Sequence, residues 1–194
     1  MPAPELDLGP AILAVGLAMR DLGGAIIGGV AISLGTRARM TSDVDAVVRA
    51  GSQTHEQFAA ALIMRGFSFR EGGSIEFARA NQIFLLRHDG TGVPVDIAFG
   101  WMPFEENAIA MADQLEVAGE RIPVARPEDL AVMKVFAGRP RDVIDVGTLL
   151  QGHPDIDRAF IEREVRLICD LLEDDERLRL WHRLATETPK RTNP

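Results

Sequence analysis

The sequence of 194 residues has few cysteines, no long apolar run and a shortage of positive charge. Its one cysteine, Cys169, excludes an internal disulfide framework and is typical of a reducing compartment. Residues 11–34 are rich in apolar side chains, but Arg20, Asp21 and several glycines interrupt them. No continuous apolar run there is long enough to cross a bilayer. The N-terminal residues lack the basic and then apolar pattern of a signal peptide. We therefore expect a cytoplasmic protein with no membrane partner.

The formal net charge is −8 at pH 7. Most of such a surface repels extended nucleic acid, so no extended nucleic-acid surface is expected. The charge does not exclude a local basic groove for an RNA end, or a single nucleotide neutralised by metal ions and a few cations. The four histidines have no metal-ligand spacing and indicate neither a zinc site nor a catalytic dyad; they are His55, His88, His153 and His182.

Two aspartates one residue apart, Asp43 and Asp45, are the most informative feature that the chain does contain. They open a β-branched, apolar stretch that predicts a strand over residues 43–49. Side chains two residues apart on a strand point the same way, so both carboxylates project from one face. They repel each other unless a positive group lies between them, and a hard divalent cation is the simplest such group.

A second predicted strand supplies a third acid. In residues 93–99, large apolar side chains alternate with Asp96, which therefore lies on the other face. A turn at residues 89–90 joins this strand to one over residues 82–87, so an antiparallel hairpin places Asp96 well inside the sheet. If the strand lies beside the first two acids, the three carboxylates can bridge two Mg²⁺ ions about 3.5–4 Å apart for phosphoryl transfer.

Two glycines, Gly28 and Gly29, follow a short predicted strand over residues 25–27 and precede a helix predicted over residues 29–35. Glycines at such a junction let the backbone approach a phosphate closely. The helix N-terminus then favours the negative charge of the phosphate.

This order of motifs, Gly-Gly, a spacer, Asp-x-Asp on a strand and a later strand Asp, resembles the nucleotidyltransferase superfamily (DNA polymerase β-like). The strings from Ile27 to Ala31 and from Arg39 to Asp45 are more particular. They are similar to the branch that holds AbiEii-type abortive-infection toxins, related bacterial nucleotidyltransferases and, more distantly, antibiotic nucleotidyltransferases. Residues 127–145 are similar to the same branch, and the matching pieces span residues 24–150.

The resemblance implies a role for each matching residue. Gly28 and Gly29 would face the triphosphate of an NTP substrate. Asp43 and Asp45 would hold the nucleotide-bound Mg²⁺. Asp96 would complete the site of a second Mg²⁺ and act as, or orient, the base for the attacking hydroxyl.

Three further residues would contact the triphosphate by the same resemblance, namely Lys134, Arg39 and Thr41. Many superfamily members have Gly-Ser where this chain has Gly28 and Gly29. The phosphate-binding Ser hydroxyl is therefore absent, and contact there would have to come from backbone N–H groups.

Ordinary structural explanations exist beside these roles. Acids on half-exposed strands are common. Lys134 lies on a helix predicted over residues 129–137 and fits an exposed helix lysine equally well. Arg37 and Arg39 fit simple countercharges for the acidic patch.

Asp142 and Asp145 are three residues apart on a helix predicted over residues 141–150, hence on one face. Ion pairs with Arg139 or Arg141 are favoured there over a role in chemistry. The helix predicted over residues 129–137 is expected to end at Gly138, because helices often end at a glycine.

The whole pattern predicts an α+β fold, a nucleotidyltransferase-type mixed β-sheet flanked by helices with a C-terminal helical region. Residues 1–125 would form the catalytic core, and residues 126–194 the helical region packing on it. Within the core, residues 67–70 and 75–78 are predicted as short strands.

Two helices complete this layout. A capping box that begins at Thr54 predicts a helix with three inward apolar residues, which are Phe58, Leu62 and Ile63. The charged run 173–179, with Trp181, predicts a further surface helix.

The sequence therefore predicts a Mg²⁺-dependent nucleotidyltransferase that moves a nucleoside monophosphate from an NTP onto a hydroxyl or phosphate and releases pyrophosphate. An RNA end, a protein and a small molecule such as an antibiotic are all open as acceptors. An antitoxin and a second copy of the chain are the partners expected beside the NTP. The competing hypothesis is a catalytically idle nucleotide-binding or protein-interaction module on the same fold.

Overall fold

The computed structural model describes residues 7–36, 41–49, 51 and 53–188. The chain forms two compact units. The described residues of the first fall within Met1–Ala31 and Arg39–Ala125, and those of the second within Ile32–Ala38 and Arg126–Pro194. None of the helices in the described part of the chain is long and apolar enough to span a membrane.

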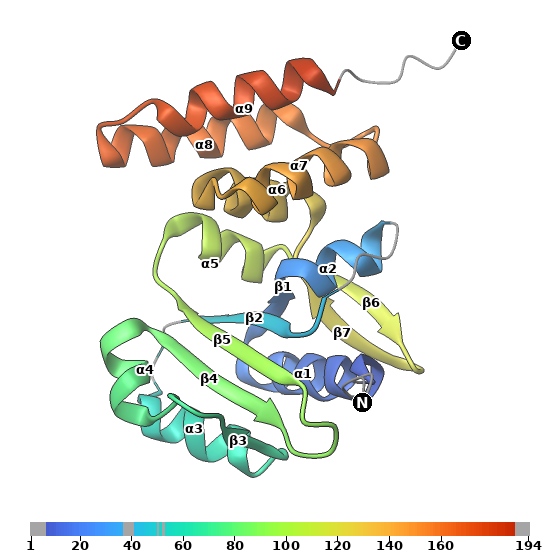
Figure 1. The fold of residues 1–194 in the computed structure, drawn as a ribbon, viewed down its shortest axis with the longest axis vertical. Coiled ribbons are helices and arrows are strands. Elements are labelled where there is room, and N and C mark those ends of the chain that lie inside the picture. Colours follow the sequence, from blue (N-terminus) through green and yellow to red (C-terminus); the bar gives the residue numbers. More distant parts are fainter. Residues whose placement is uncertain (1–6, 37–40, 50, 52, 189–194) are drawn as a thin grey trace, which may run out of the picture. The chain divides into compact units, whose positions relative to one another are not determined.

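The first unit is a mixed sheet with helices packed against it (Figure 1). Its elements in chain order are α1 (Leu8–Leu22), β1 (Gly24–Ile27), β2 (Val44–Arg49), α3 (His55–Ile63), β3 (Phe67–Phe69), α4 (Ile75–Asn81), β4 (Ile83–His88), β5 (Pro94–Gly100), α5 (Pro103–Ala110), β6 (Asp113–Val117) and β7 (Glu120–Val124). The strand order is β3-β4-β5-β2-β1-β7-β6. The pairs β2–β5 and β1–β7 are parallel and the others antiparallel. The predicted α+β class with a mixed sheet is confirmed.

Strand β5 shows why the sheet forms as it does. Val95, Ile97 and Phe99 are buried on one face, while Asp96 on the other face is half-buried. The predicted hairpin of β4 with β5 is present, and it leaves β5 between β4 and β2. Asp96 therefore lies well inside the sheet, as expected.

The second unit is helical. It consists of α6 (Pro127–Ala137), α7 (Pro140–Gly152), α8 (Arg158–Leu172) and α9 (Glu176–Glu187), and α2 (Gly28–Gly35) runs from the first unit into it. Helix α6 packs against α7, α8 and α9. It is capped by Gly138, whose φ of 62° is left-handed, and Arg177 Nε of α9 donates to the carbonyl oxygen of Phe136 at 2.7 Å. This hydrogen bond links the C-terminal end of α6 to the N-terminal end of α9.

The strand predicted over residues 75–78 is wrong, because these residues begin helix α4. The apolar side chains of Ile75 and Phe77 are two residues apart, and over so short a stretch this spacing resembles one face of a strand. The side chain of Ser74 instead accepts a hydrogen bond from the backbone N–H of Phe77 and caps the helix. Such local capping outweighs the alternation.

Two burial predictions also differ from the structure. Phe58 and Leu62 are buried as expected, but Ile63 is 52% exposed, because a residue adjacent to Leu62 points about 100° away around the helix. The helix with Trp181 is not simply a surface helix. Trp181 is 1% exposed and lies in the core of the helical unit, among the buried residues of α9.

Replacement of Trp181 by alanine should lower the free energy of unfolding of the helical unit by about 3–5 kcal/mol, because it removes a large buried side chain. The matched control is Trp101→Ala, since Trp101 is 69% exposed. The control should change stability by less than about 1 kcal/mol. Urea unfolding followed by circular dichroism measures both, and equal losses in the two variants would contradict the packing described here.

Candidate active site

The register of β2 on β5 brings two of the predicted acids together. The strands pair in parallel with Asp45 directly opposite Asp96. Neighbouring strands are about 4.8 Å apart, and residues opposite each other point to the same face. Both aspartates are half-buried. The expected adjacency of the Asp96 strand to the first strand is therefore confirmed.

Gly28 lies against Asp45. It directly follows β1, whose last residue, Ile27, pairs with Asp45. Its φ is 70°, and a Cβ added there would lie 2.7 Å from Asp45 Cγ and closer still to Oδ2. Only glycine fits this position. The N-terminus of α2, with Gly29 in its first turn, is thus held beside the carboxylate.

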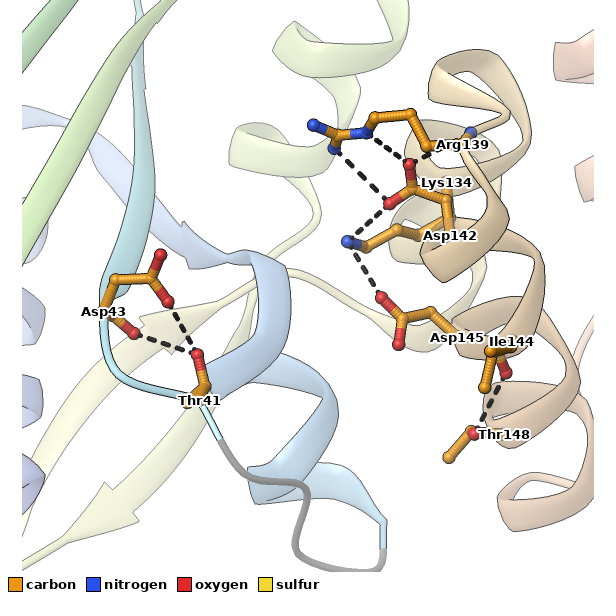
Figure 2. A network of polar contacts seen from close by, with 8 residues as sticks. All are labelled: Thr41, Asp43, Lys134, Arg139, Asp142, Ile144, Asp145 and Thr148. Carbon is orange, nitrogen blue, oxygen red and sulfur yellow. Dashed lines mark hydrogen bonds and ion pairs between the residues drawn. The ribbon is translucent and has the colours of Figure 1, made fainter.

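Asp43 directly precedes β2, and its side chain is held by a hydrogen bond from Thr41. The Thr41 hydroxyl donates to Asp43 Oδ1 at 2.7 Å and lies 3.3 Å from its carbonyl oxygen (Figure 2). Thr41 thus orients the Asp43 carboxylate, and its predicted contact with a triphosphate stays a prediction. The predicted residues Arg37 and Arg39 lie outside the described residues.

A residue that the sequence analysis missed, Arg70, completes this face. Its Nη2 donates to Asp96 Oδ1 at 2.6 Å, and the two side chains are 34% and 24% exposed. Arg70 follows β3, and its backbone N–H bonds to the carbonyl of Leu85, which pairs with Asp96. The sequence offers no direct signal for the pair, because 26 positions separate its members and only the order β3-β4-β5 aligns them.

Electrostatics explains why Arg70 matters. Two full negative charges about 5 Å apart repel by roughly 3 kcal/mol at an effective dielectric constant of about 20. The positive group that the neighbouring acids need is here supplied by the protein. Within the described residues, no three His, Cys, Asp or Glu side chains are grouped so as to hold a metal ion.

The residues present nevertheless fit Mg²⁺ bound together with a nucleotide. Mg²⁺ prefers oxygen ligands and usually takes only one or two carboxylates, with substrate phosphates and water completing its shell. Asp45 and Asp96 supply two carboxylates on one face, and Gly28 brings the N-terminus of α2 beside Asp45. A complete cage of protein ligands is not required.

The predicted cation Lys134 lies in the helical unit and is not an exposed helix lysine. Its side chain is 14% exposed, and Nζ lies 3.0 Å from both Asp142 Oδ1 and Asp145 Oδ2 (Figure 2). Arg139 Nε donates to Asp142 Oδ2 at 2.6 Å, which is the expected ion pair. Both acids are almost fully buried. Their structural role is clear, and contact of Lys134 with a triphosphate stays a prediction.

The pKa of Asp142 indicates that its ion pairs with Lys134 and Arg139 stabilise the charged carboxylate. Burial raises this pKa, but hydrogen bonds from Arg139 and Lys134 and the positive charges of both outweigh burial, and they hold the pKa below its ordinary value of 3.8. A carboxylate with a depressed folded-state pKa stabilises the fold above its unfolded pKa. That stability is lost as the pH falls through the folded pKa.

Asp142→Asn should therefore lower the free energy of unfolding by about 2 kcal/mol at pH 7, through loss of charge-assisted hydrogen bonds. The deficit should shrink when the pH falls below about 4, because the parent then loses the same contribution. Urea titrations at pH 7 and at pH 3 measure this. A deficit of the same size at both pH values would count against the ion cluster as its source.

Comparison with known proteins bears on this geometry. The family model described as "Nucleotidyl transferase AbiEii toxin, Type IV TA system" matches residues 25–191. None of the curated proteins matches the chain.

Solved structures share the fold. A nucleotidyltransferase-like antigenic protein from Paracoccidioides brasiliensis has a TM-score of 0.53 at 18% identity, with 92% of this chain and 95% of that chain covered. The antibiotic-resistance factor ANT(2'')-Ia has a TM-score of 0.56 at 17% identity, over 84% of this chain and 92% of its own. JHP933 from Helicobacter pylori has a TM-score of 0.50 at 12% identity, over 92% and 88%.

The resemblance noted in the sequence is therefore confirmed over most of the chain. The family match includes β1 from Ala25 onward, both acidic strands and helices α6 to α9 of the second unit. This chain belongs to the family of AbiEii nucleotidyl transferase toxins of type IV toxin–antitoxin systems.

Proposed function

We propose that this protein is a Mg²⁺-dependent nucleotidyltransferase that moves a nucleoside monophosphate from an NTP onto a hydroxyl or phosphate acceptor. The observation that supports it best is the row formed by Gly28, Asp45 and Asp96 on one face of the sheet. The row offers carboxylates for a metal and a helix N-terminus for a phosphate. Membership of the toxin family agrees with this chemistry.

Each residue of the row has a distinct task in the proposed reaction. Bound Mg²⁺ would supply neutralisation of the charge that builds up on the transferred phosphoryl group. Asp45 and Asp43 would hold the nucleotide-bound ion, with Thr41 orienting Asp43. Asp96 would complete the site of the second ion and would act as, or orient, the base that takes the proton of the attacking hydroxyl. Backbone N–H groups at Gly28 bind the phosphates.

The family does not specify the acceptor, so three acceptor classes are proposed for testing. An RNA end and a protein are tested first, because the family is one of toxins, and a small molecule is tested after them. An antitoxin is the proposed partner, because the family belongs to toxin–antitoxin systems. Self-association is a separate proposal, and size-exclusion chromatography addresses it directly.

Asp45→Asn and Asp96→Asn should each lower NMP transfer about a thousandfold, since each removes a carboxylate that a metal ion needs. The assay incubates the parent with each α-labelled NTP and Mg²⁺ in a cell extract and separates the label by nuclease and protease digestion. The matched control is Asp113→Asn, an exposed aspartate at the start of β6. Full transfer by either acidic-site variant would overturn the proposal.

Gly28→Ala tests the phosphate side of the site. The new Cβ meets the Asp45 carboxylate and the left-handed backbone resists a side chain, so Asp45 must move. We expect transfer to fall at least about tenfold, because catalysis depends on positions held within fractions of an ångström. Gly147→Ala is the control, since a Cβ there meets no neighbouring atom. Equal activity of the two variants would show that Gly28 has no role in the transfer reaction.

One observation favours the competing function, an idle nucleotide-binding or interaction module. Asp96 is already paired with Arg70, so the acidic face has a countercharge without any metal. Calorimetry with each NTP, with and without Mg²⁺, distinguishes the two functions. The transferase requires binding that depends on Mg²⁺ and is lost in the Asp43→Ala, Asp45→Ala variant. Binding that ignores both supports the idle module.

A further inference from the structure

We propose that Arg70 is a positioning residue that holds Asp96 when no nucleotide is bound and makes access of a divalent cation to Asp96 depend on a phosphate-bearing ligand. This inference rests on the proposed function, because it concerns the same acidic face. Arg70 was not among the residues that the sequence motifs indicated.

The placement of Arg70 follows from the sheet. A single row runs from Arg70, which directly follows β3, across three strands, through Leu85 of β4 and Asp96 of β5 to Asp45 of β2. The guanidinium reaches over Leu85 to Asp96 and stops one strand short of Asp45. Its Nε is buried and has no hydrogen-bond partner among the described residues. Among the described residues, the Arg70 side chain donates to Asp96 through Nη2, at 2.6 Å.

The contact places Arg70 in competition with a metal ion. Arg70 Nη2 occupies Asp96 Oδ1, one of the two oxygens through which Asp96 could bind a cation. A divalent ion that took this oxygen would face a guanidinium at contact distance, and two positive groups repel strongly in a half-buried setting. A bare ion must therefore displace Arg70 and leave it without a partner.

A phosphate changes this balance. The guanidinium binds phosphate oxygens through paired, charge-assisted hydrogen bonds, so a triphosphate offers Arg70 a new partner when it leaves Asp96. The bound ion and the released guanidinium are then both neutralised by the same ligand. Cation and nucleotide should consequently strengthen each other's binding, and by thermodynamic reciprocity the coupling factor is the same in both directions.

The experiment measures Mn²⁺ affinity by calorimetry and by the Mn²⁺ electron paramagnetic resonance signal, first with Mn²⁺ alone. Arg70→Ala should bind Mn²⁺ about five- to tenfold more tightly than the parent, because one charge-assisted hydrogen bond no longer competes. Arg70→Gln, which keeps most of the packing of the side-chain stem, should shift in the same direction. The control is Arg65→Ala, which removes an arginine paired with Asp21 of α1, and it should stay within about twofold of the parent.

The coupling is measured by repeating these titrations with a non-hydrolysable NTP. In the parent, the analogue should tighten Mn²⁺ binding by a larger factor than in Arg70→Ala, and the difference should be about five- to tenfold. In an Asp96→Asn background the replacement of Arg70 should have no further effect, since the competed oxygen is gone.

Unchanged Mn²⁺ affinity in both Arg70 variants overturns the inference, as does equal coupling in the parent and Arg70→Ala. The outcome is separable from that of the proposed function. Asp96-dependent NMP transfer with no effect of Arg70 on Mn²⁺ would leave the transferase and remove the role of Arg70. Tighter Mn²⁺ binding in Arg70→Ala without any NTP binding by the parent would remove the transferase and its coupling but retain the competition at Asp96.

Discussion

The parallel register of β2 on β5 is the constraint on which the rest of the site depends. It sets Asp45 opposite Asp96, and the same register sets the buried pairs Ala46–Ile97 and Val48–Phe99 on the other face. A slip of one residue would turn an acid into the core and an apolar side chain outward. Core packing on the opposite face therefore determines the position of the carboxylates.

In both units, buried or crowded carboxylates are neutralised by a cation from a different segment of the chain. Arg70 serves Asp96 in the sheet, and Lys134 serves Asp142 and Asp145 in the helical unit. The difference is exposure. The helical cluster is nearly dry, so loss of one member leaves an uncompensated buried charge and costs stability. The Arg70 pair is partly solvated, so it can open at modest cost.

Much of this layout could be predicted because it rests on local patterns. The alternation around Asp96, the glycine pair and the capping box at Thr54 each depend on neighbours within a few residues. The failures have the same origin. Residues 75–78 are too short to distinguish a strand from a helix by periodicity, and the charged run before Trp181 concealed a buried face that only the packing of α9 on α6, α7 and α8 defines.

The sequence by itself determined the acidic strands, the two glycines that begin α2 and the family, because motif order and the alternation of residues can be read along the chain. Only the tertiary structure decided that Arg70 neutralises Asp96, that Gly28 has no room for a side chain beside Asp45, and that Lys134 is held between two carboxylates. The physical reason is that charge and steric contacts act through space over a few ångströms. Strand order and helix packing, which bring distant residues within that range, are settled by burial of the whole core.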